Sequence, residues 1–336
     1  MDLLIYNAAV LRGRWSGVEW AVWQRAIEFF RAAAPGSFLL LAPRGVALSD
    51  GIPESAVVRL PRFTGCRAGR ILHELFLMPG LVRRLLARHG GAGGRFIAPA
   101  YVAPPRLPIP FILCLYDLHV YTHPGFCTLA NRLHYRWRMP SSIRRAEVIE
   151  VPSEHVRDAL ERLFPKYAGK AQVRHLVLRD RFRGPATEAE KAAVRAKYGL
   201  PARYLLFVGD PAPRKNLPAA LEAWRSVRRD EGNGDLAFVL AGDMAPDDMA
   251  VPGAITLGYV ADADLPALYS AADALVYPSF DEGFGLPIVE ARACGCPVVT
   301  SSPTAWEIAP DAIRCGTDAA SIAEALRKAL HACYNS

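Results

Sequence analysis

Long apolar runs, paired cysteine motifs and a secretion signal are all missing from this sequence of 336 residues. No stretch approaches the roughly 18 uninterrupted apolar residues of a membrane-spanning helix. The opening segment, MDLLIYNAAVLRGRW, has no basic stretch before its apolar run, so no signal peptide is expected. The seven cysteines are an odd, scattered set without a CxxC pair. The sequence therefore predicts a reduced, cytoplasmic chain without a disulfide framework or a zinc site.

The composition excludes disordered and low-complexity classes, because 51% of the residues are hydrophobic and 22% are charged. The formal charge is +7, and the isoelectric point is near 9.1. A basic chain favours anionic partners: nucleotides, phosphates, acidic lipids or nucleic acid. No nucleic-acid-binding motif accompanies the charge, so no nucleic-acid partner is expected.

The length favours two domains. Short apolar runs alternate with longer helical patterns, which predicts α/β architecture with parallel sheets. The expected strands are 3–6, 38–41, 111–115, 148–151, 173–178, 204–208, 237–241, 254–257, 274–277 and 297–300. The expected helices include 18–33, 217–229, 264–272, 287–293 and 319–332. A polar, charged segment separates the two series, so we expect domains at 1–180 and 201–336 with a linker region at 181–200.

One candidate anion site follows the expected strand 204–208. The chain there continues as Gly209-Asp-Pro-Ala-Pro-Arg214-Lys215-Asn216, and a helix is expected to begin at 217 or 218. A bent loop with two cations, between the end of a strand and the start of a helix, suits a phosphate. The alternative is a capped turn with solvated charges.

A second candidate loop follows the expected strand 274–277, with the sequence YPSFDEGFGLPIVE. Gly283 and Gly285 allow backbone to approach a ligand. Glu282 and Glu290 flank the start of the next helix, where two carboxylates could hold different hydroxyl-rich parts of one ligand. Taken singly, each glutamate is more often a solvated charge at a helix end.

These segments resemble a known family. EGFGLPIVEARACGCPVVTS, with its Glu-x7-Glu spacing, is similar to the signature of retaining GT-B glycosyltransferases of family 4. FVGDPAPRKN resembles the phosphate loop of that family, and LGYV resembles its segment near the nucleotide base. The resemblance runs from about 203 to 328. It implies two Rossmann-like domains facing a cleft, with an NDP-sugar held mainly by the second domain.

The resemblance also implies roles for individual residues. Arg214 and Lys215 would neutralise the pyrophosphate. Glu290 would hold the ribose, and Glu282 would hold the donor sugar. The remaining candidate donor contacts are Gly17, Gly209, Tyr259, Val260, Gly283, Phe284, Gly285 and Leu286. The family transfers sugar with retention and usually without a metal, so no metal site and no cofactor are expected.

In the first half, Ser16-Gly17-Val18-Glu19 resembles the glycine turn before the first helix, and LYDLHVYTHPG resembles a strand and loop that face the cleft. Three departures stand out. Asp117 follows Tyr116 where the family commonly has His-Asp, which leaves His119 as the candidate catalytic substitute. Asp210 replaces an arginine found in many members, and Arg214 is the candidate replacement. The chain also ends at Ser336, where relatives usually continue with further helices.

Two metal-like patterns have simpler explanations. Asp262-Ala-Asp264 imitates a metal-binding DxD, but its place before a helix favours capping. His119 and His123 have the spacing of metal ligands on a helix, but Val120, Thr122 and Pro124 argue against a helix there.

Arginines also accumulate in the first half. They lie at positions 83, 84, 88, 132, 136, 138, 144 and 145, near apolar residues at 75–77, 81, 85 and 86. Two explanations of this arginine series remain: the arginines lie on solvated helix faces, or they dock the protein on an anionic membrane surface.

The sequence therefore predicts a peripheral membrane glycosyltransferase on the inner face of the cytoplasmic membrane, acting in bacterial surface-polysaccharide or glycolipid assembly. The expected donor is an NDP-hexose, with GDP-mannose or a GDP-deoxyhexose as the first choice. The expected acceptor is a glycan or a lipid-linked sugar. A sugar-nucleotide epimerase of similar fold and a donor-binding, non-transferring homologue remain as alternatives.

Overall fold

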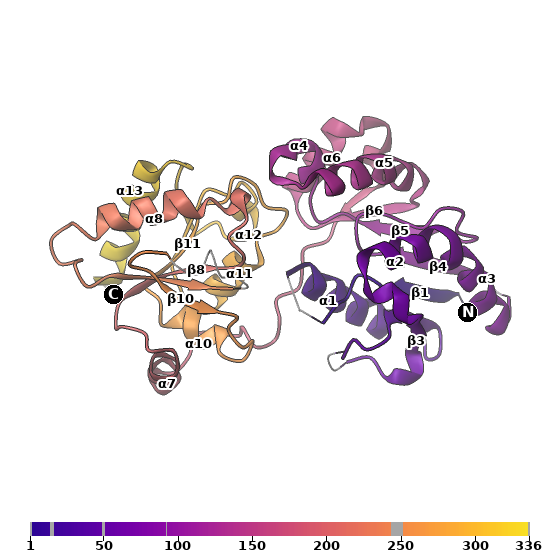
Figure 1. Cartoon of the computed structure of the whole chain (residues 1–336), viewed down its shortest axis with the longest axis horizontal. Helices are drawn as coiled ribbons and strands as arrows, with labels where there is room; N and C mark the ends of the chain where they lie inside the picture. The colour runs from indigo at the N-terminus through magenta and orange to yellow at the C-terminus, as the bar shows by residue number, and fades with distance from the viewer. Residues whose placement is uncertain (1, 14–16, 49–50, 92, 243–250, 335–336) are drawn as a thin grey trace. The chain divides into compact units, whose positions relative to one another are not determined.

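A computed structural model describes residues 2–13, 17–48, 51–91, 93–242 and 251–334. The chain divides into two compact units, Met1–Val177 and Leu178–Ser336. Each unit is an α/β domain with its own parallel sheet (Figure 1). None of the described helices is long and apolar enough to cross a membrane.

The first unit contains a seven-stranded parallel sheet in the order β3-β2-β1-β4-β5-β6-β7. Its strands are β1 (Leu3–Asn7), β2 (Phe38–Pro43), β3 (Val57–Leu60), β4 (Gly94–Ala98), β5 (Phe111–Cys114), β6 (Val148–Val151) and β7 (Ala171–Val173). Its helices are α1 (Gly17–Ala32), α2 (Arg67–Leu72), a π-helical turn (His73–Leu77), α3 (Met78–Arg88), α4 (His119–Thr122), α5 (Leu129–Arg145) and α6 (Glu154–Leu163).

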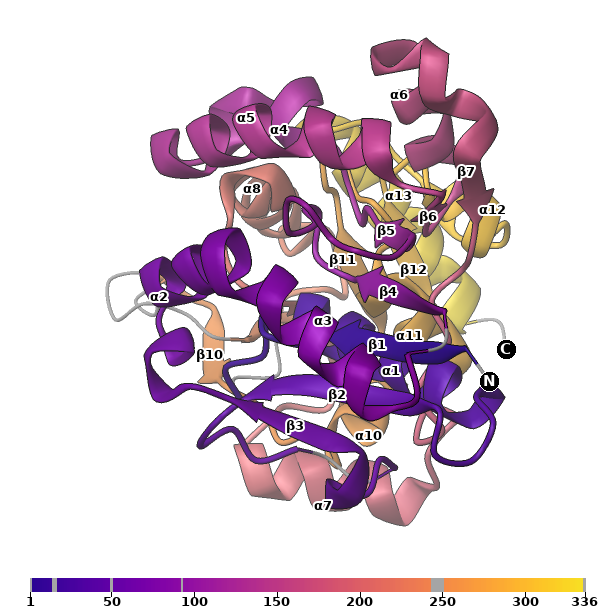
Figure 2. The ribbon, with the colours of Figure 1, turned by 90° about the vertical axis from the view of Figure 1, so that its right-hand side faces the viewer.

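Helices cover both faces of this sheet, which explains why its strands are apolar without alternation. Successive side chains of a strand point to opposite faces, so neighbours join different cores. Ile5 belongs to the core shared with α3, α5 and α6, whereas Tyr6 belongs to the core shared with α1. Trp23 of α1 is fully buried in that second core. Figure 2 shows α3 in front of the sheet and α1 behind it.

The second unit contains a six-stranded sheet in the order β10-β9-β8-β11-β12-β13. Its strands are β8 (Tyr204–Val208), β9 (Ala237–Ala241), β10 (Ile255–Gly258), β11 (Ala274–Tyr277), β12 (Val298–Thr300) and β13 (Ile313–Arg314). Its helices are α7 (Glu188–Tyr198), α8 (Leu217–Val227), α10 (Leu265–Ser270), α11 (Leu286–Ala293), α12 (Ala305–Ile308) and α13 (Ala319–Tyr334). Helices α8 and α13 share one core with the sheet, and α7, α10 and α11 contribute to the other.

Both sheets follow the doubly wound order in which the chain runs outward on one side of the first strand and then outward on the other. The expectation of two Rossmann-like domains is therefore confirmed. Several boundaries differ from the expected ones. The strand expected at 173–178 ends at Val173, and residues 119–122, expected to be non-helical, form the single turn α4. The segment 181–200, expected to be a linker, belongs to the second unit, because Val194 and Leu200 are buried in its core.

Candidate donor site in the second unit

The order of the second sheet reverses between β8 and β11, which lie side by side. In open α/β sheets, ligands bind outside the carboxyl ends of the strands at such a switch point. The loops that leave these two strands are 209–216 and 278–285, and both were selected from the sequence. An ion pair links them, because the Arg214 guanidinium donates a hydrogen bond to Oε1 of Glu282.

The loop after β8 folds tightly around Lys215. Gly209 has a φ of +121°, and a Cβ at this position would lie 2.1 Å from the Lys215 Nζ atom. The ammonium is buried and lies 2.5 Å from Oδ1 of Asp210. Burial alone would raise the pKa of Asp210, but Lys215 and Arg214 outweigh burial and hold that pKa below its usual range. The glycine therefore makes room for a cation that the loop neutralises internally.

Asn216 ends this loop in the left-handed region, with a φ of +56°, and occupies the N-cap position of α8. Its side chain does not cap the helix. The Nδ2 atom instead donates to the carbonyl of Thr317, 2.7 Å away. Asn216 thus ties the phosphate-loop candidate to the segment before α13, which fixes where Lys215 and Arg214 lie.

Glu282 is buried at the centre of the second loop. Besides Arg214, its Oε1 atom accepts from the Tyr277 hydroxyl at 3.0 Å and from the Ser279 hydroxyl at 3.1 Å. The Thr304 hydroxyl also donates to the Glu282 carbonyl, at 2.6 Å. The carboxylate is therefore rigidly held and already paired with a cation.

The backbone from Gly283 to Leu286 leads directly into α11. Gly285 is the N-cap residue, with a φ of +84°, and a Cβ there would lie 2.9 Å from Cδ1 of Ile288. Phe284 is buried. The predicted donor contacts at 283–286 therefore lie in one turn, beside Glu282 and at the start of a helix, where backbone amides attract oxygen acceptors.

Glu290, one turn into α11, is buried in a network that the sequence reasoning did not find. Its Oε1 atom accepts from Nη2 of Arg179 at 2.8 Å, and its Oε2 atom accepts from the Tyr269 hydroxyl at 3.1 Å. Arg179 also donates to Asp262 at 2.9 Å. Burial raises the pKa of Glu290, and Arg179 counteracts part of that rise. Arg179 was overlooked because it lies in the polar segment before the expected linker.

The segment after β10 contains the candidates for the base. Tyr259 is 63% exposed, whereas Val260 is buried. Burial and the charge of Asp262 raise the pKa of Tyr259, and Arg179 lowers it, so this phenol lies within electrostatic range of the Glu290 network. Capping by Asp264 is wrong: its side chain binds Lys197 and the Tyr198 hydroxyl, each at 2.6 Å, and does not cap α10.

The candidates of the first unit form a separate group. Asp117 accepts from the Tyr101 hydroxyl at 2.6 Å and from the His119 backbone amide at 3.1 Å. The His119 ring is buried, with Nδ1 at 3.4 Å from the same carboxylate. Gly17 is the first residue of α1, and Ser16 lies outside the described residues. The described residues include no group of three or more side chains suited to hold a metal ion.

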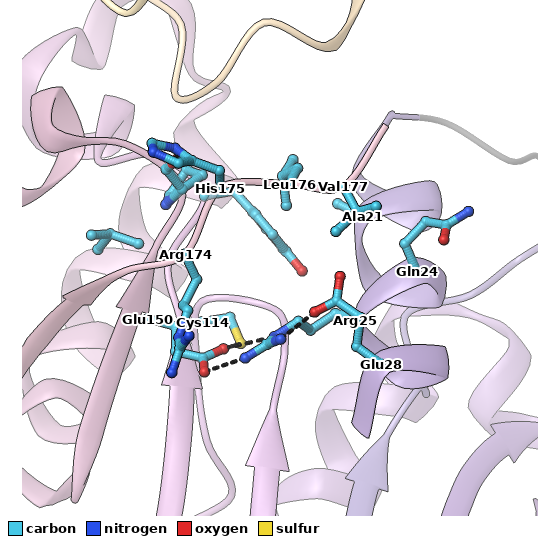
Figure 3. Close-up of a pocket in the computed structure, with 13 residues that line it drawn as sticks. Ala21, Gln24, Arg25, Glu28, Cys114, Glu150, Arg174, His175, Leu176 and Val177 are labelled. Atoms are coloured by element: carbon cyan, nitrogen blue, oxygen red, sulfur yellow. Dashed lines mark hydrogen bonds and ion pairs between the residues drawn. The ribbon is translucent and has the colours of Figure 1, made fainter. Parts of the chain in front are cut away.

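A pocket at the carboxyl ends of β5 and β6, beside α1, was also missed (Figure 3). Arg25 lies against it and donates from Nε to Oε2 of Glu150 at 2.9 Å, and it also pairs with Glu28. The Cys114 thiol lies 3.6 Å from the same Oε2 atom. Burial and Glu150 raise the pKa of Cys114 well above its usual range, so the thiol stays protonated and is a poor nucleophile. The pocket is therefore a neutralised ion-pair site.

Comparison with known proteins shows what the second unit is similar to. Residues 202–332 match the family glycosyl transferases group 1. The chain is 32% identical over 226 residues to O-antigen chain mannosyltransferase B of Escherichia coli, a match that covers 64% of this chain and 58% of that protein. It is 26% identical over 195 residues to O-antigen chain mannosyltransferase RfbU of Salmonella typhimurium, covering 56% of this chain and 51% of that protein. The matched region thus spans little more than half the length of these relatives.

Solved structures resemble the whole chain. WaaG, a glycosyltransferase involved in lipopolysaccharide biosynthesis, aligns with a TM-score of 0.70 and 15% identity over 98% of this chain and 90% of that one. Anabaena Alr3699/HepE, in complex with UDP and glucose, aligns with a TM-score of 0.68 and 16% identity over 99% of this chain and 91% of that one. Together these matches show that the chain has the two-domain GT-B fold and that residues 202–332, within the second unit, are similar to group 1 glycosyl transferases.

Proposed function

We propose that this chain is a retaining glycosyltransferase of family 4, which moves a hexose from an NDP-sugar to a lipid-linked or oligosaccharide acceptor. One observation carries the proposal. Within a group 1 glycosyltransferase domain, the two loops at the switch point bring Arg214, Lys215 and Glu282 together. The similarity to O-antigen mannosyltransferases supports a place in bacterial surface-polysaccharide or glycolipid assembly. The proposal includes a position on the inner face of the cytoplasmic membrane.

In this proposal the second unit stabilises the leaving nucleoside diphosphate. Arg214 and Lys215 bind the pyrophosphate, whose negative charge grows as the glycosidic bond breaks, and fixed cations lower the barrier to that step. Glu282 and the amides of residues 284–286 orient the donor sugar, and Glu290 accepts from the ribose hydroxyls. The acceptor hydroxyl attacks from the face that the leaving group vacates. Glu282 and Glu290 therefore do not act as the acid and nucleophile of a glycoside hydrolase.

The proposed donor is GDP-mannose or a GDP-deoxyhexose, because the curated relatives quoted above are mannosyltransferases by name. A uridine nucleotide is the competing donor, since a structural neighbour was solved with UDP. In this proposal Arg214 and Lys215 neutralise the negative charge of the pyrophosphate, so we expect the transfer to need no metal ion.

A thermal-shift panel with GDP, UDP, ADP and dTDP, each with and without EDTA, tests the donor site. A nucleotide at a hundredfold excess over its Kd stabilises the folded state by about 2.7 kcal/mol. We expect one nucleotide to raise the melting temperature regardless of EDTA. Failure of all four, or loss of the shift with EDTA, would contradict the proposed site.

Product analysis with the matching sugar nucleotide then separates the three activities. A new glycosidic bond that retains the anomeric configuration supports the proposal. An epimerised sugar nucleotide indicates the epimerase, and an unchanged donor indicates a non-transferring homologue. Heat-denatured protein serves as the control for spontaneous donor hydrolysis.

A further inference from the structure

The first unit exposes a set of large apolar side chains on two neighbouring helical segments, which we call the α2–α5 surface. Its members are Leu129, Leu133 and Trp137 of α5, together with Leu72, Phe76 and Leu77 of α2 and the π-helical turn. Single exposed apolar residues need no explanation, but several large ones gathered on two helical segments of one unit indicate an interaction site.

On α5 the exposed residues form a regular stripe. Leu129, Leu133 and Trp137 follow one another at intervals of four, which places them on one side of the helix. They are 66%, 65% and 70% exposed. The other side of the helix buries Met139 and Ile143 in the core of the unit. The helix therefore has a core-facing apolar side and a second apolar side that the described part of the chain leaves exposed.

The second segment has the same division. Leu72, Phe76 and Leu77 are 54%, 73% and 50% exposed, whereas His73 and Met78 are buried. The apolar residues that the sequence associated with a membrane lie partly elsewhere, since Leu85 is buried in the core and Leu81 and Leu86 pack against it. The candidate membrane contact therefore lies on α5 and on the turn before α3, and not on α3 itself.

The charge of the two segments is almost entirely of one sign. Residues 62–88 contain six arginines and residues 128–145 contain five, with no lysine in either segment. The one acidic residue in these ranges is Glu74. Its Oε1 atom accepts from Nδ2 of the buried Asn7 at 3.2 Å, so this carboxylate is engaged with the end of β1.

Arginines from both segments affect the pKa of one histidine, His134. Burial lowers the pKa of His134 on α5, and Arg138, Arg67 and Arg70 lower it further, to about 4. Two of these arginines belong to α2. The two helices, which can be followed in Figure 2, therefore contribute to one positive region rather than two.

We propose that the α2–α5 surface docks on an anionic lipid bilayer, with its leucine, phenylalanine and tryptophan side chains inserted at the headgroup boundary and its arginines paired with lipid phosphates. In-plane helices bind membranes by this combination of apolar area and basic charge. Each cation near an anionic leaflet adds attraction, and tryptophan favours the interface. A second copy of the chain fits poorly, because it would bring two sets of arginines together.

Sedimentation of the full chain with vesicles tests this docking. We expect binding to vesicles of phosphatidylcholine mixed with phosphatidylglycerol that is at least tenfold tighter than binding to phosphatidylcholine alone, and that weakens at high salt. The measurement needs neither donor nor acceptor. Lipid docking can therefore be confirmed when the nucleotide panel fails, and it can fail when the panel succeeds.

The variant Leu129→Ser/Leu133→Ser/Trp137→Ser should bind the anionic vesicles at least tenfold more weakly. Arg67→Gln/Arg144→Gln should lose most of the preference for phosphatidylglycerol. The matched controls are Trp306→Ser, which removes a half-exposed tryptophan from the second unit, and Arg225→Gln/Arg229→Gln, which removes two exposed arginines there. Both controls should bind vesicles as the parent does, and unchanged melting temperatures would verify that all variants fold.

Three results would overturn the proposal. The first is equal binding to both vesicle types, and the second is loss of binding in the controls as large as in the α2–α5 variants. The third is a parent that is dimeric in solution and becomes monomeric in the triple serine variant, since the surface would then be an interface between copies.

Discussion

At the scale of single residues, the two cations proposed to hold the pyrophosphate are already paired with carboxylates, Arg214 with Glu282 and Lys215 with Asp210. Unpaired buried charges are costly, so these two ion pairs stabilise the folded loops. Binding of a diphosphate then exchanges one anion for another. The binding free energy gained from each cation is therefore smaller than a phosphate would gain from an unpaired lysine. Changes to either carboxylate should alter the affinity for the diphosphate.

Lys215→Ala should lower kcat/KM for the sugar nucleotide. The expected loss of transition-state stabilisation is about 1.5–3 kcal/mol, the value of a hydrogen bond to a charged group. This equals roughly a tenfold to hundredfold loss. Steady-state kinetics would measure it. Lys197→Ala, which removes an exposed lysine paired with Asp264, is the control and should leave kcat/KM unchanged. Parental efficiency in Lys215→Ala would refute the phosphate assignment.

Asp210→Asn should act in the opposite direction. The amide keeps the shape of the side chain but no longer neutralises Lys215, so a nucleoside diphosphate meets less competition. We expect a threefold to tenfold lower Kd, about 0.7–1.4 kcal/mol, by isothermal titration calorimetry. Asp235→Asn, on an exposed loop of the same unit, controls for the change in net charge. Weaker binding by Asp210→Asn would mean that Asp210 supports the site.

Glu290→Gln should weaken binding of the free nucleoside diphosphate several-fold, because an amide is a poorer acceptor than a carboxylate for ribose hydroxyls. The Tyr269 hydroxyl can still donate to the amide oxygen, which limits the structural damage. Calorimetry with the nucleotide, and with inorganic pyrophosphate as a ligand without ribose, separates the two effects. Equal losses for both ligands would argue against ribose recognition.

At the scale of elements, sequence patterns were reliable for most of the strands that are buried on both faces. The runs that form β1, β2, β8, β9 and β11 were found with nearly correct bounds for this reason. The edge strands β3 and β13 were missed, since each is short and only partly buried. The central strand β4 was missed as well, although its residues Phe96, Ile97 and Ala98 are buried. The single turn α4 was missed because a helix of four residues depends on its tertiary contacts rather than on its own sequence.

The same contrast applies to the site. Glu282, Glu290, Arg214 and Lys215 could be selected because glycine-rich loops after buried strands are a local signal. Their internal partners could not. Arg179 and Tyr269 reach Glu290 from 111 and 21 positions away, and only the packing of the unit brings them there.

Gly285 provides the prediction at this scale. Gly285→Ala forces an alanine into the left-handed region and pushes its Cβ towards Ile288, which should lower the free energy of unfolding by about 1–2 kcal/mol. Urea denaturation would measure the loss. Gly234→Ala is the control, since a Cβ there meets no atom within 4 Å and its φ is not positive. Equal stability of the two variants would show that the turn before α11 tolerates a side chain.

At the scale of the whole molecule, each unit has its own sheet and its own pair of cores, and the proposed nucleotide contacts of the second unit are local to it. A nucleoside diphosphate should therefore slow hydrogen exchange most strongly in segments 207–217 and 279–291. Hydrogen–deuterium exchange with mass spectrometry, with and without the best nucleotide, measures this. Inorganic phosphate at the same concentration is the control. Strongest protection within 1–177 would place the nucleotide in the wrong unit.

The bond between Arg179 and Glu290 has a consequence for the start of the second unit. Arg179 is the second residue of the second unit, and it is bonded to Glu290, the residue proposed to receive the ribose. A ligand that binds this carboxylate competes with Arg179, whose hydrogen bond to Glu290 holds the start of the unit in place. By thermodynamic linkage, a nucleotide that weakens the Arg179–Glu290 bond must bind more tightly, by the same factor, when that bond is weakened by other means. Occupancy of the proposed ribose site and release of Arg179 from Glu290 are thus coupled through one equilibrium.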